Sequence, residues 1–195
     1  MATILGLLLG ITGIGATAYF ARKAREESRE RRRLEWADLE AAANDLGKCI
    51  KRDVKPVAIV TPGLCGATFA NLLADHLPDQ PPVFVGISVW KDDPHGSVQF
   101  DDTIRIETGK WLVFIPCAIT RYTEGDILIL DDFVMSGDFL ERLRAALISA
   151  GIKEGNIHSV AIAATGVAIK SHKAPDYHWW TAESDDFYFP WGKAR

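Results

Sequence analysis

The sequence predicts an α/β fold, a mainly parallel twisted sheet flanked by helices, preceded by one transmembrane helix. Short apolar runs typical of buried strands alternate with amphipathic helical stretches, the pattern of βαβ units in a parallel sheet covered on both faces. The 195 residues are 48% hydrophobic and 25% charged, as in a folded chain. An uncharged N-terminal run comes first. We therefore divide the chain into a transmembrane helix (1–21), a charged juxtamembrane helix or linker (22–35) and a globular domain (36–195).

Residues 2–21 are expected to anchor the protein in a membrane. They carry no charged side chain, and a helix of this length spans about 30 Å, the thickness of the hydrocarbon core. The basic residues that follow favour the cytoplasmic side. This predicts a single-pass protein with its N-terminus outside and its globular domain in the cytoplasm. A cleaved signal peptide is one alternative, although its positive charges should precede the apolar run. A buried or interfacial helix of a soluble protein is the other.

Charge and cysteine content exclude several classes of function. Residues 22–35 contain seven Lys or Arg and four Glu, whereas the remainder is acidic and the net charge is -4. An acidic domain argues against nucleic-acid binding, so no nucleic-acid partner is expected. Cys49, Cys65 and Cys117 are far apart and form no C-x-x-C pair. This spacing argues against a zinc ribbon, a redox pair and a secreted disulfide scaffold.

The elements of the globular domain follow from periodicity. An apolar stripe at helical spacing predicts a first helix that packs on its own domain, or alternatively on a partner helix. The stripe consists of Trp36, Leu39, Ala43, Leu46 and Ile50. Apolar runs predict strands at 56–60, 83–90, 126–130 and 160–165, with amphipathic helices at 67–77 and 139–150. The polar segment 91–102 is expected to form a mobile loop. A hairpin of strands 103–107 and 111–117 is expected to follow it.

The most informative stretch is 127–140. Four apolar residues end in Asp131 and Asp132, and a helix is expected after the Ser136-Gly137 turn. Ligands of parallel sheets bind beyond the carboxyl ends of the strands. Adjacent carboxylates suit sugar hydroxyls or a hydrated divalent cation, and amides at a helix N-terminus suit a phosphate. Together they indicate a pentose-phosphate site. The alternative is that the acids are ordinary loop and capping residues.

This stretch resembles the type I phosphoribosyltransferases. In that family an acidic pair after an apolar strand precedes a Thr/Ser-Gly turn that binds the 5-phosphate of phosphoribosyl pyrophosphate (PRPP). The resemblance covers about residues 36–192. Residues 57–77 look like the family's first strand–turn–helix unit, and 91–117 stand where the family has its flexible catalytic loop. Residues 160–192, with Pro175-Asp176-Tyr177 and a late Pro-Trp, are similar to the purine and xanthine branch.

The resemblance implies transfer of phosphoribosyl from PRPP to a purine-type base or similar acceptor, with release of pyrophosphate and with Mg²⁺ as cofactor. Asp131 and Asp132 would be catalytic, holding the ribose hydroxyls and contacting the metal only indirectly. The loop 91–110 would close over the site. The phosphate-binding turn would consist of Ser136, Gly137, Asp138, Phe139 and Leu140. The pyrophosphate turn would consist of Thr61, Pro62 and Gly63. The base would contact Lys170 (Lys173 being the less favoured alternative), Phe187, Phe189 and Trp191.

Several residues depart from the family pattern. Asp138 brings a negative charge to the phosphate turn, and Phe139 replaces a hydroxyl donor. The pyrophosphate turn at 61–63 lacks a cation, and Asp186 replaces a ring that would stack on the base. Two functions therefore stay open: a membrane-anchored transferase, or an inactive nucleotide- or phosphosugar-binding or scaffold module tethered to the membrane. Members of the family often form dimers, so a homodimer is also open.

Overall fold

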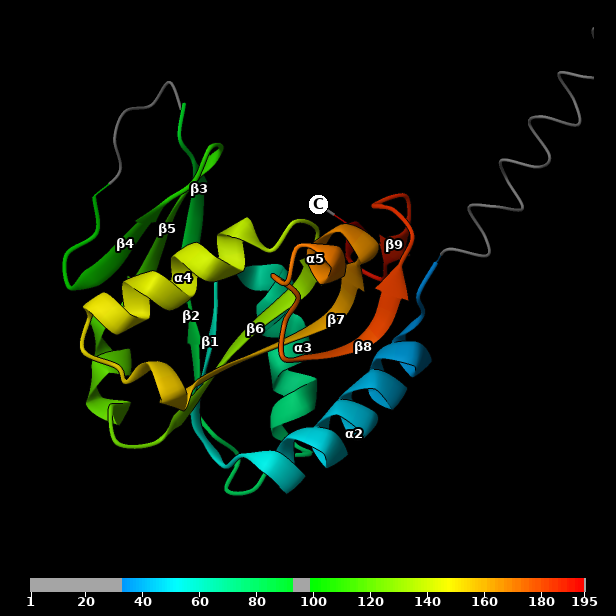
Figure 1. The fold of residues 1–195 in the computed structure, drawn as a ribbon, viewed down its shortest axis with the longest axis horizontal. Coiled ribbons are helices and arrows are strands. Elements are labelled where there is room, and N and C mark those ends of the chain that lie inside the picture. The colour runs from blue at the N-terminus through cyan, green and yellow to red at the C-terminus, as the bar shows by residue number, and fades with distance from the viewer. Residues whose placement is uncertain (1–32, 93–98, 195) are drawn as a thin grey trace, which may run out of the picture.

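The computed structural model describes residues 33–92 and 99–194 (Figure 1). Their centre is a five-stranded sheet in the order β2-β1-β6-β7-β8. All its strand pairs are parallel, which confirms the predicted fold class. The strands are β1 (Pro56–Thr61), β2 (Val83–Val85), β6 (Asp126–Val134), β7 (Ile157–Thr165) and β8 (Tyr177–Ala182). β7 is almost wholly buried, as expected of a strand with a layer on each face.

Helices cover both faces of this sheet. α2 (Trp36–Asp53) and α3 (Leu64–Ala74) share one hydrophobic core with the sheet, and α4 (Asp138–Ser149) shares the other. The predicted stripe of α2 packs on its own domain: Leu39 and Ile50 are fully buried, although Trp36 is 52% exposed. Glu35 and Asp38 form a capping box that starts the helix, and the Glu35 amide donates to Asp38 Oδ2 at 2.8 Å.

A second, antiparallel sheet contains the predicted hairpin. β3 (Ile87–Trp90), β4 (Thr103–Glu107) and β5 (Trp111–Pro116) pair in the order β3-β5-β4. The prediction of one strand over 83–90 is wrong, because β2 and β3 belong to different sheets. They separate at Gly86, whose amide donates to the Thr61 carbonyl at 2.7 Å. A Cβ at Gly86 would lie 2.9 Å from the Pro62 carbonyl oxygen and 2.6 Å from Ile115 Cδ1, so the close backbone approach between the sheets favours glycine.

Other boundaries also differ from the prediction, including that of β7, which begins at Ile157 rather than at 160. β6 continues through Asp131 and Asp132 to Val134, so the acids lie in the strand and not beyond it. α3 begins at Leu64 and ends at Ala74, earlier than the 67–77 helix expected. Residues 33–35 are extended rather than helical, and the Leu34 amide donates to the Tyr188 carbonyl at 2.8 Å.

The short C-terminal elements complete the fold. They are α5 (Gly166–Lys170), β9 (Tyr188–Phe189) and β10 (Gly192–Lys193), with 3-10 turns at Cys117–Tyr122 and Glu154–Asn156. The predicted anchor at 2–21 and most of the linker at 22–35 lie outside the described residues. Within the described part of the chain, every helix is too short or too polar to cross a bilayer.

Gly66→Ala should destabilise the fold by about 2 kcal/mol, because α3 packs tightly under the turn after β1. A Cβ at Gly66 would lie 2.2 Å from Thr61 Oγ1 and 3.0 Å from the Leu130 carbonyl oxygen. Helix propensity alone predicts the opposite sign, a gain of about 1 kcal/mol. Urea denaturation measures the change. Gly155→Ala is the control, since a Cβ there meets nothing within 4 Å, and equal stabilities of both variants would contradict this packing.

Candidate functional site

The topology of the parallel sheet defines where a ligand should bind. The chain runs from β1 outward to β2, and later from β6 outward to β7 and β8, so the strand order reverses between β1 and β6. Ligands of open α/β sheets bind at such a switch point, beyond the carboxyl ends of the two strands. The turn 61–63 leaves β1 at this point, and Asp131 and Asp132 lie near the end of β6. Two predicted site segments therefore meet at one edge of the sheet.

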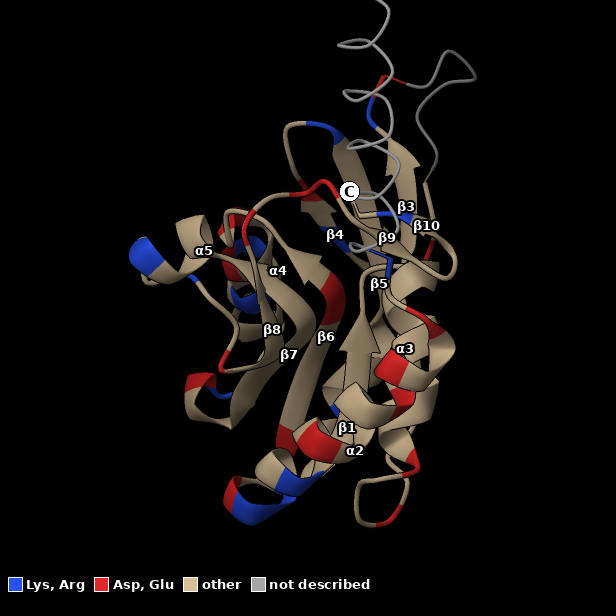
Figure 2. Cartoon of the chain, turned by 90° about the vertical axis from the view of Figure 1, so that its right-hand side faces the viewer, with Lys and Arg blue, Asp and Glu red and all other residues tan. Residues whose placement is uncertain are grey.

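Asp131 and Asp132 are partly buried carboxylates at this edge (the red band beside the β6 label in Figure 2). The Asp132 amide donates to Asp131 Oδ1 at 3.0 Å. Burial raises the pKa of Asp131 well above its ordinary value, and the charge of Asp132 adds to the increase. Burial also raises the pKa of Asp132. Among the described residues, no Lys, Arg or His forms an ion pair with either acid, so no cation of the described chain neutralises the pair.

Trp191 contacts one of the two acids, Asp132. Its indole Nε1 donates to Asp132 Oδ2 at 3.1 Å, and this hydrogen bond opposes the burial effect on the pKa of Asp132. The ring stacks on Phe189 with centroids 5.0 Å apart and planes at 10°, and it meets the edge of Trp36 at 6.0 Å. The start of α2 and the C-terminal strands thus hold Trp191 against the carboxylate.

Trp191→Phe should raise the pKa of Asp132 further, because the variant loses a hydrogen bond to the charged carboxylate but keeps an aromatic ring. The carboxyl carbon signals of Asp132 and its coupled neighbour Asp131, followed by NMR against pH, measure the change. Trp111→Phe is the control, since Trp111 stacks on Trp90 in the antiparallel sheet. An Asp132 titration that is identical in both variants would show that the indole does not act on the acid.

The predicted phosphate turn lies directly after β6. Gly137 adopts a left-handed conformation (φ 82°) and caps α4, whose first amides lack intrahelical acceptors. The Ser136 hydroxyl donates to Asp138 Oδ2 at 3.0 Å, and Lys173 Nζ donates to Asp138 Oδ1 at 2.7 Å. These two bonds hold the pKa of Asp138 below its ordinary value. Phe139 and Leu140 pack against the core of the α4 face, so only their amides can take part in binding.

The predicted pyrophosphate turn contains no cation. Thr61 is fully buried, and its hydroxyl donates to the Gly63 carbonyl at 3.1 Å. The Ser88 hydroxyl donates to the Pro62 carbonyl at 2.7 Å. Ser88, which the sequence did not single out, is brought here by β3. Both hydroxyls therefore stabilise the turn itself, and the turn presents no charged group to a ligand.

The predicted base-binding residues are dispersed. Phe187 and Phe189 are each 1% exposed and pack as core residues, edge to face with one another. Lys170 is exposed at the end of α5 and forms no hydrogen bond or ion pair with a described side chain. Figure 2 shows that end of α5 directed away from β9 and β10. Trp191 alone touches the acidic pair. A nearby pocket of about 250 Å³ is lined by Trp180, Thr181, Glu183, Ser184, Asp186 and Phe187.

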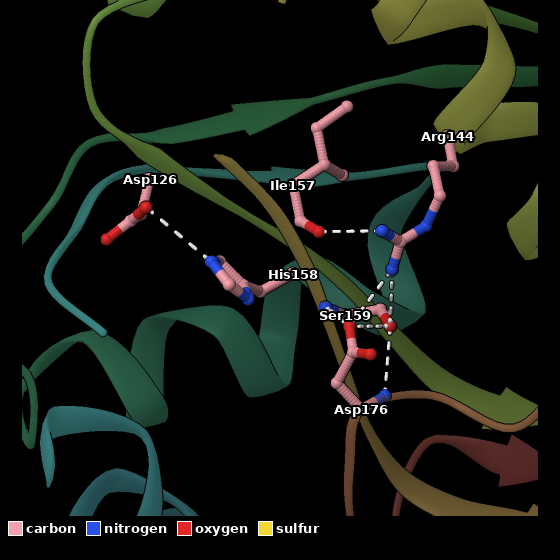
Figure 3. Close-up of polar contacts among 6 residues, drawn as sticks. All are labelled: Asp126, Arg144, Ile157, His158, Ser159 and Asp176. Atoms are coloured by element: carbon pink, nitrogen blue, oxygen red, sulfur yellow. Dashed lines mark hydrogen bonds and ion pairs between the residues drawn. The ribbon is translucent and has the colours of Figure 1, made fainter. Parts of the chain in front are cut away.

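The Pro175-Asp176-Tyr177 motif lies at the opposite edge of the sheet, where β8 begins (Figure 3). Asp176 Oδ2 accepts from both the amide and the hydroxyl of Ser159, each at 2.7 Å, and from Arg144 Nη2 at 3.0 Å. Arg144 also donates to the Ile157 carbonyl at 2.7 Å. This cluster joins α4, β7 and the start of β8, so its role is structural.

Comparisons with known proteins agree with this geometry. Residues 34–194 match the model of the phosphoribosyl transferase domain. A comparison with curated proteins gives no match. Similar solved structures include a purine phosphoribosyltransferase from Pyrococcus horikoshii (TM-score 0.62, 21% identity, covering 83% of this chain and 93% of that one). A Neisseria gonorrhoeae hypothetical protein with bound ppGpp is also similar (TM-score 0.59, 16% identity, 81% and 86% covered). So is a xanthine-guanine-hypoxanthine phosphoribosyltransferase from Helicobacter pylori (TM-score 0.52, 19% identity, 82% and 92% covered).

The matched segment includes the switch point, the acidic pair, the glycine-capped turn and the C-terminal Pro-Trp. It leaves out residues 1–33 and Arg195. This chain belongs to the phosphoribosyl transferase domain family.

Proposed function

We propose that this protein is a membrane-anchored phosphoribosyltransferase that binds PRPP at the switch point between β1 and β6. It transfers the phosphoribosyl group to a purine-type base or a similar acceptor and releases pyrophosphate. The observation that carries the proposal is the partly buried pair Asp131–Asp132, free of described cations and followed by the capped N-terminus of α4. Family membership and the purine-type titles of similar structures support it.

In this mechanism each part of the site has one task. Asp131 and Asp132 accept hydrogen bonds from the ribose hydroxyls and stabilise the positive charge that develops on the ring as the bond from C1 to pyrophosphate breaks. A base nitrogen then bonds to C1. The amides of 136–140 donate to the 5-phosphate, and the Gly63 amide, at the start of α3, faces pyrophosphate. Trp191 walls the acceptor side.

The site is compatible with Mg²⁺. Two carboxylates without a described cationic partner are the oxygen ligands that Mg²⁺ accepts, usually beside substrate phosphates and water. In the described residues there is no group of three or more His, Cys, Asp or Glu that could hold a metal alone. Asp131 and Asp132 would hold the ion through its water or the ribose. When bound, it would neutralise the pyrophosphate charge.

A second candidate is an inactive module that binds a nucleotide or phosphosugar, or serves as a scaffold. The uncharged turn at 61–63, the burial of Phe187 and Phe189, and the remote position of Lys170 favour it. The ppGpp-bound relative is consistent with nucleotide binding. Heat on titration with PRPP and Mg²⁺, followed by pyrophosphate release with guanine, xanthine or hypoxanthine, supports the transferase. A binding heat without release of pyrophosphate supports the inactive module. The absence of any binding heat contradicts both the transferase and PRPP binding.

Membrane anchoring through residues 2–21 is part of the proposal. Its support is the uncharged run and the basic segment after it, because basic residues beside a membrane span favour the cytoplasmic side. Carbonate extraction of membranes tests it: the full chain should remain in the pellet, and a chain lacking residues 1–32 should be released. Sedimentation of the full chain in detergent decides between a monomer and a homodimer.

A further inference from the structure

Lys173 pairs with two acids in the first turn of α4. Its Nζ is 2.7 Å from Asp138 Oδ1 and 2.8 Å from Glu141 Oε2. Among the described residues, no other Lys or Arg forms an ion pair with either acid. Arg142 attracts Asp138 only from a greater distance, since its guanidinium donates to the Glu107 carbonyl at 3.1 Å. Lys173 is therefore the direct counter-ion of both acids.

The backbone fixes Lys173 in this position. Its amide donates to the Ala168 carbonyl at 2.9 Å, which ties it to α5. Its carbonyl oxygen lies 2.1 Å from the point where a Cβ on Gly137 would stand. Only glycine at 137 allows the turn after α5 to approach the turn before α4 so closely. The phosphate turn and Lys173 are thus one packed unit.

Asp138 would oppose phosphate binding if it had no counter-ion. A carboxylate in the first turn of a helix competes with a phosphate for the positive end of the helix dipole and repels it. In the structure the two oxygens of Asp138 have different partners: Oδ1 accepts from Lys173, and Oδ2 accepts from Ser136. The Ser136 hydroxyl can therefore turn to a phosphate while Asp138 keeps its ion pair.

We propose that Lys173 is a positioning residue of the phosphate turn. It neutralises Asp138 and Glu141 and holds Asp138 by Oδ1, so that Ser136 and the α4 amides can bind the 5-phosphate of PRPP despite the acid at 138. The inference rests on the proposed function. The two carboxylates raise the pKa of Lys173 to about 12, so its charge persists at neutral pH.

Calorimetric titration of the full chain with PRPP and Mg²⁺ tests the inference. Lys173→Met should weaken binding about tenfold at low salt, and less at 0.5 M salt, because salt screens exposed charges. Lys173→Arg should bind like the wild type. Lys153→Met is the matched control, since Lys153 also forms an exposed ion pair, with Glu124 at 3.1 Å, but belongs to no predicted site, and it should leave affinity unchanged. The double variant Lys173→Met/Asp138→Asn should return to within about threefold of the wild type.

The outcomes separate this inference from the proposed function. If the wild type binds PRPP and Lys173→Met binds equally well, the inference is overturned and the proposed function stands. If the double variant stays as weak as Lys173→Met, Lys173 does not act through Asp138, and the inference is also overturned. A wild type that does not bind overturns both. If Lys173→Met has a melting temperature too low for the titration, Lys173→Gln replaces it. The PRPP affinity of Lys173→Gln at low and at high salt is then compared with that of the wild type.

Discussion

Replacing Asp131 with Asn should reduce phosphoribosyl transfer by about 10²–10³-fold while making the folded protein more stable at pH 7. The rate falls because the ring charge that develops in the transition state loses its nearest carboxylate. The stability rises because burial raises the pKa of Asp131 well above its ordinary value, so the ionised form is costly in the folded state. Asn keeps the oxygen that accepts from the Asp132 amide at 3.0 Å.

The direction of the expected stability change follows from how the stability of the wild type depends on pH. A raised folded pKa means that the folded chain binds more protons than the unfolded chain, so wild-type stability falls as pH rises from the ordinary Asp range through the raised pKa. The Asn variant lacks this loss, so its advantage should vanish in acid. Thermal melts across pH, with single-turnover rates, measure both effects. Asp45→Asn, at an exposed site on α2, is the control. An Asp131→Asn variant that is less stable at pH 7, or fully active, would contradict the assignment.

Asp176→Ala should destabilise the fold by about 2–4 kcal/mol without changing PRPP affinity below the melting temperature. The substitution leaves the hydroxyl of Ser159, which is 1% exposed, and the guanidinium of Arg144 without their shared carboxylate acceptor (Figure 3). Urea denaturation should show a lower midpoint at an unchanged slope. The lost contacts join α4, β7 and the start of β8, and none of them involves Asp131 or Asp132.

Asp185→Ala is the matched control for this cluster. Asp185 is exposed and forms no hydrogen bond or ion pair with a described side chain, so its removal should change stability by less than about 0.5 kcal/mol. If Asp176→Ala instead weakens PRPP binding at unchanged stability, the Pro175-Asp176-Tyr177 motif reaches the site, and its structural assignment is wrong.

Local patterns were enough to predict most of the fold. The apolar runs predicted β1, β6 and β7, and the turn at 108–110 predicted the β4–β5 hairpin. The prediction of a single strand over 83–90 was wrong because this one apolar segment contributes a strand to each of two sheets. Its break at Gly86 depends on contacts with Thr61 and Ile115 that come from other strands. Periodicity within a single segment carries no information about such contacts.

The site was predicted less completely, because its decisive contacts are distant in sequence. Asp131 and Asp132 could be identified from the abrupt end of an apolar run. The Trp191–Asp132 bond joins residues 59 positions apart, and the Lys173–Asp138 pair joins residues 35 apart. Nothing local distinguishes Lys173 from Lys170, and only the close approach of Gly137 brings Lys173 to α4. Likewise, the aromatic content of 187–191 does not reveal that two of its rings are buried.

A crystal structure of the full chain with PRPP and Mg²⁺ tests the central claim most directly. The account predicts density for the 5-phosphate over the amides of 136–140, and ribose hydroxyls within hydrogen-bond distance of Asp131 and Asp132. PRPP bound elsewhere, or a switch point that stays closed by Trp191 at saturating PRPP, would contradict it.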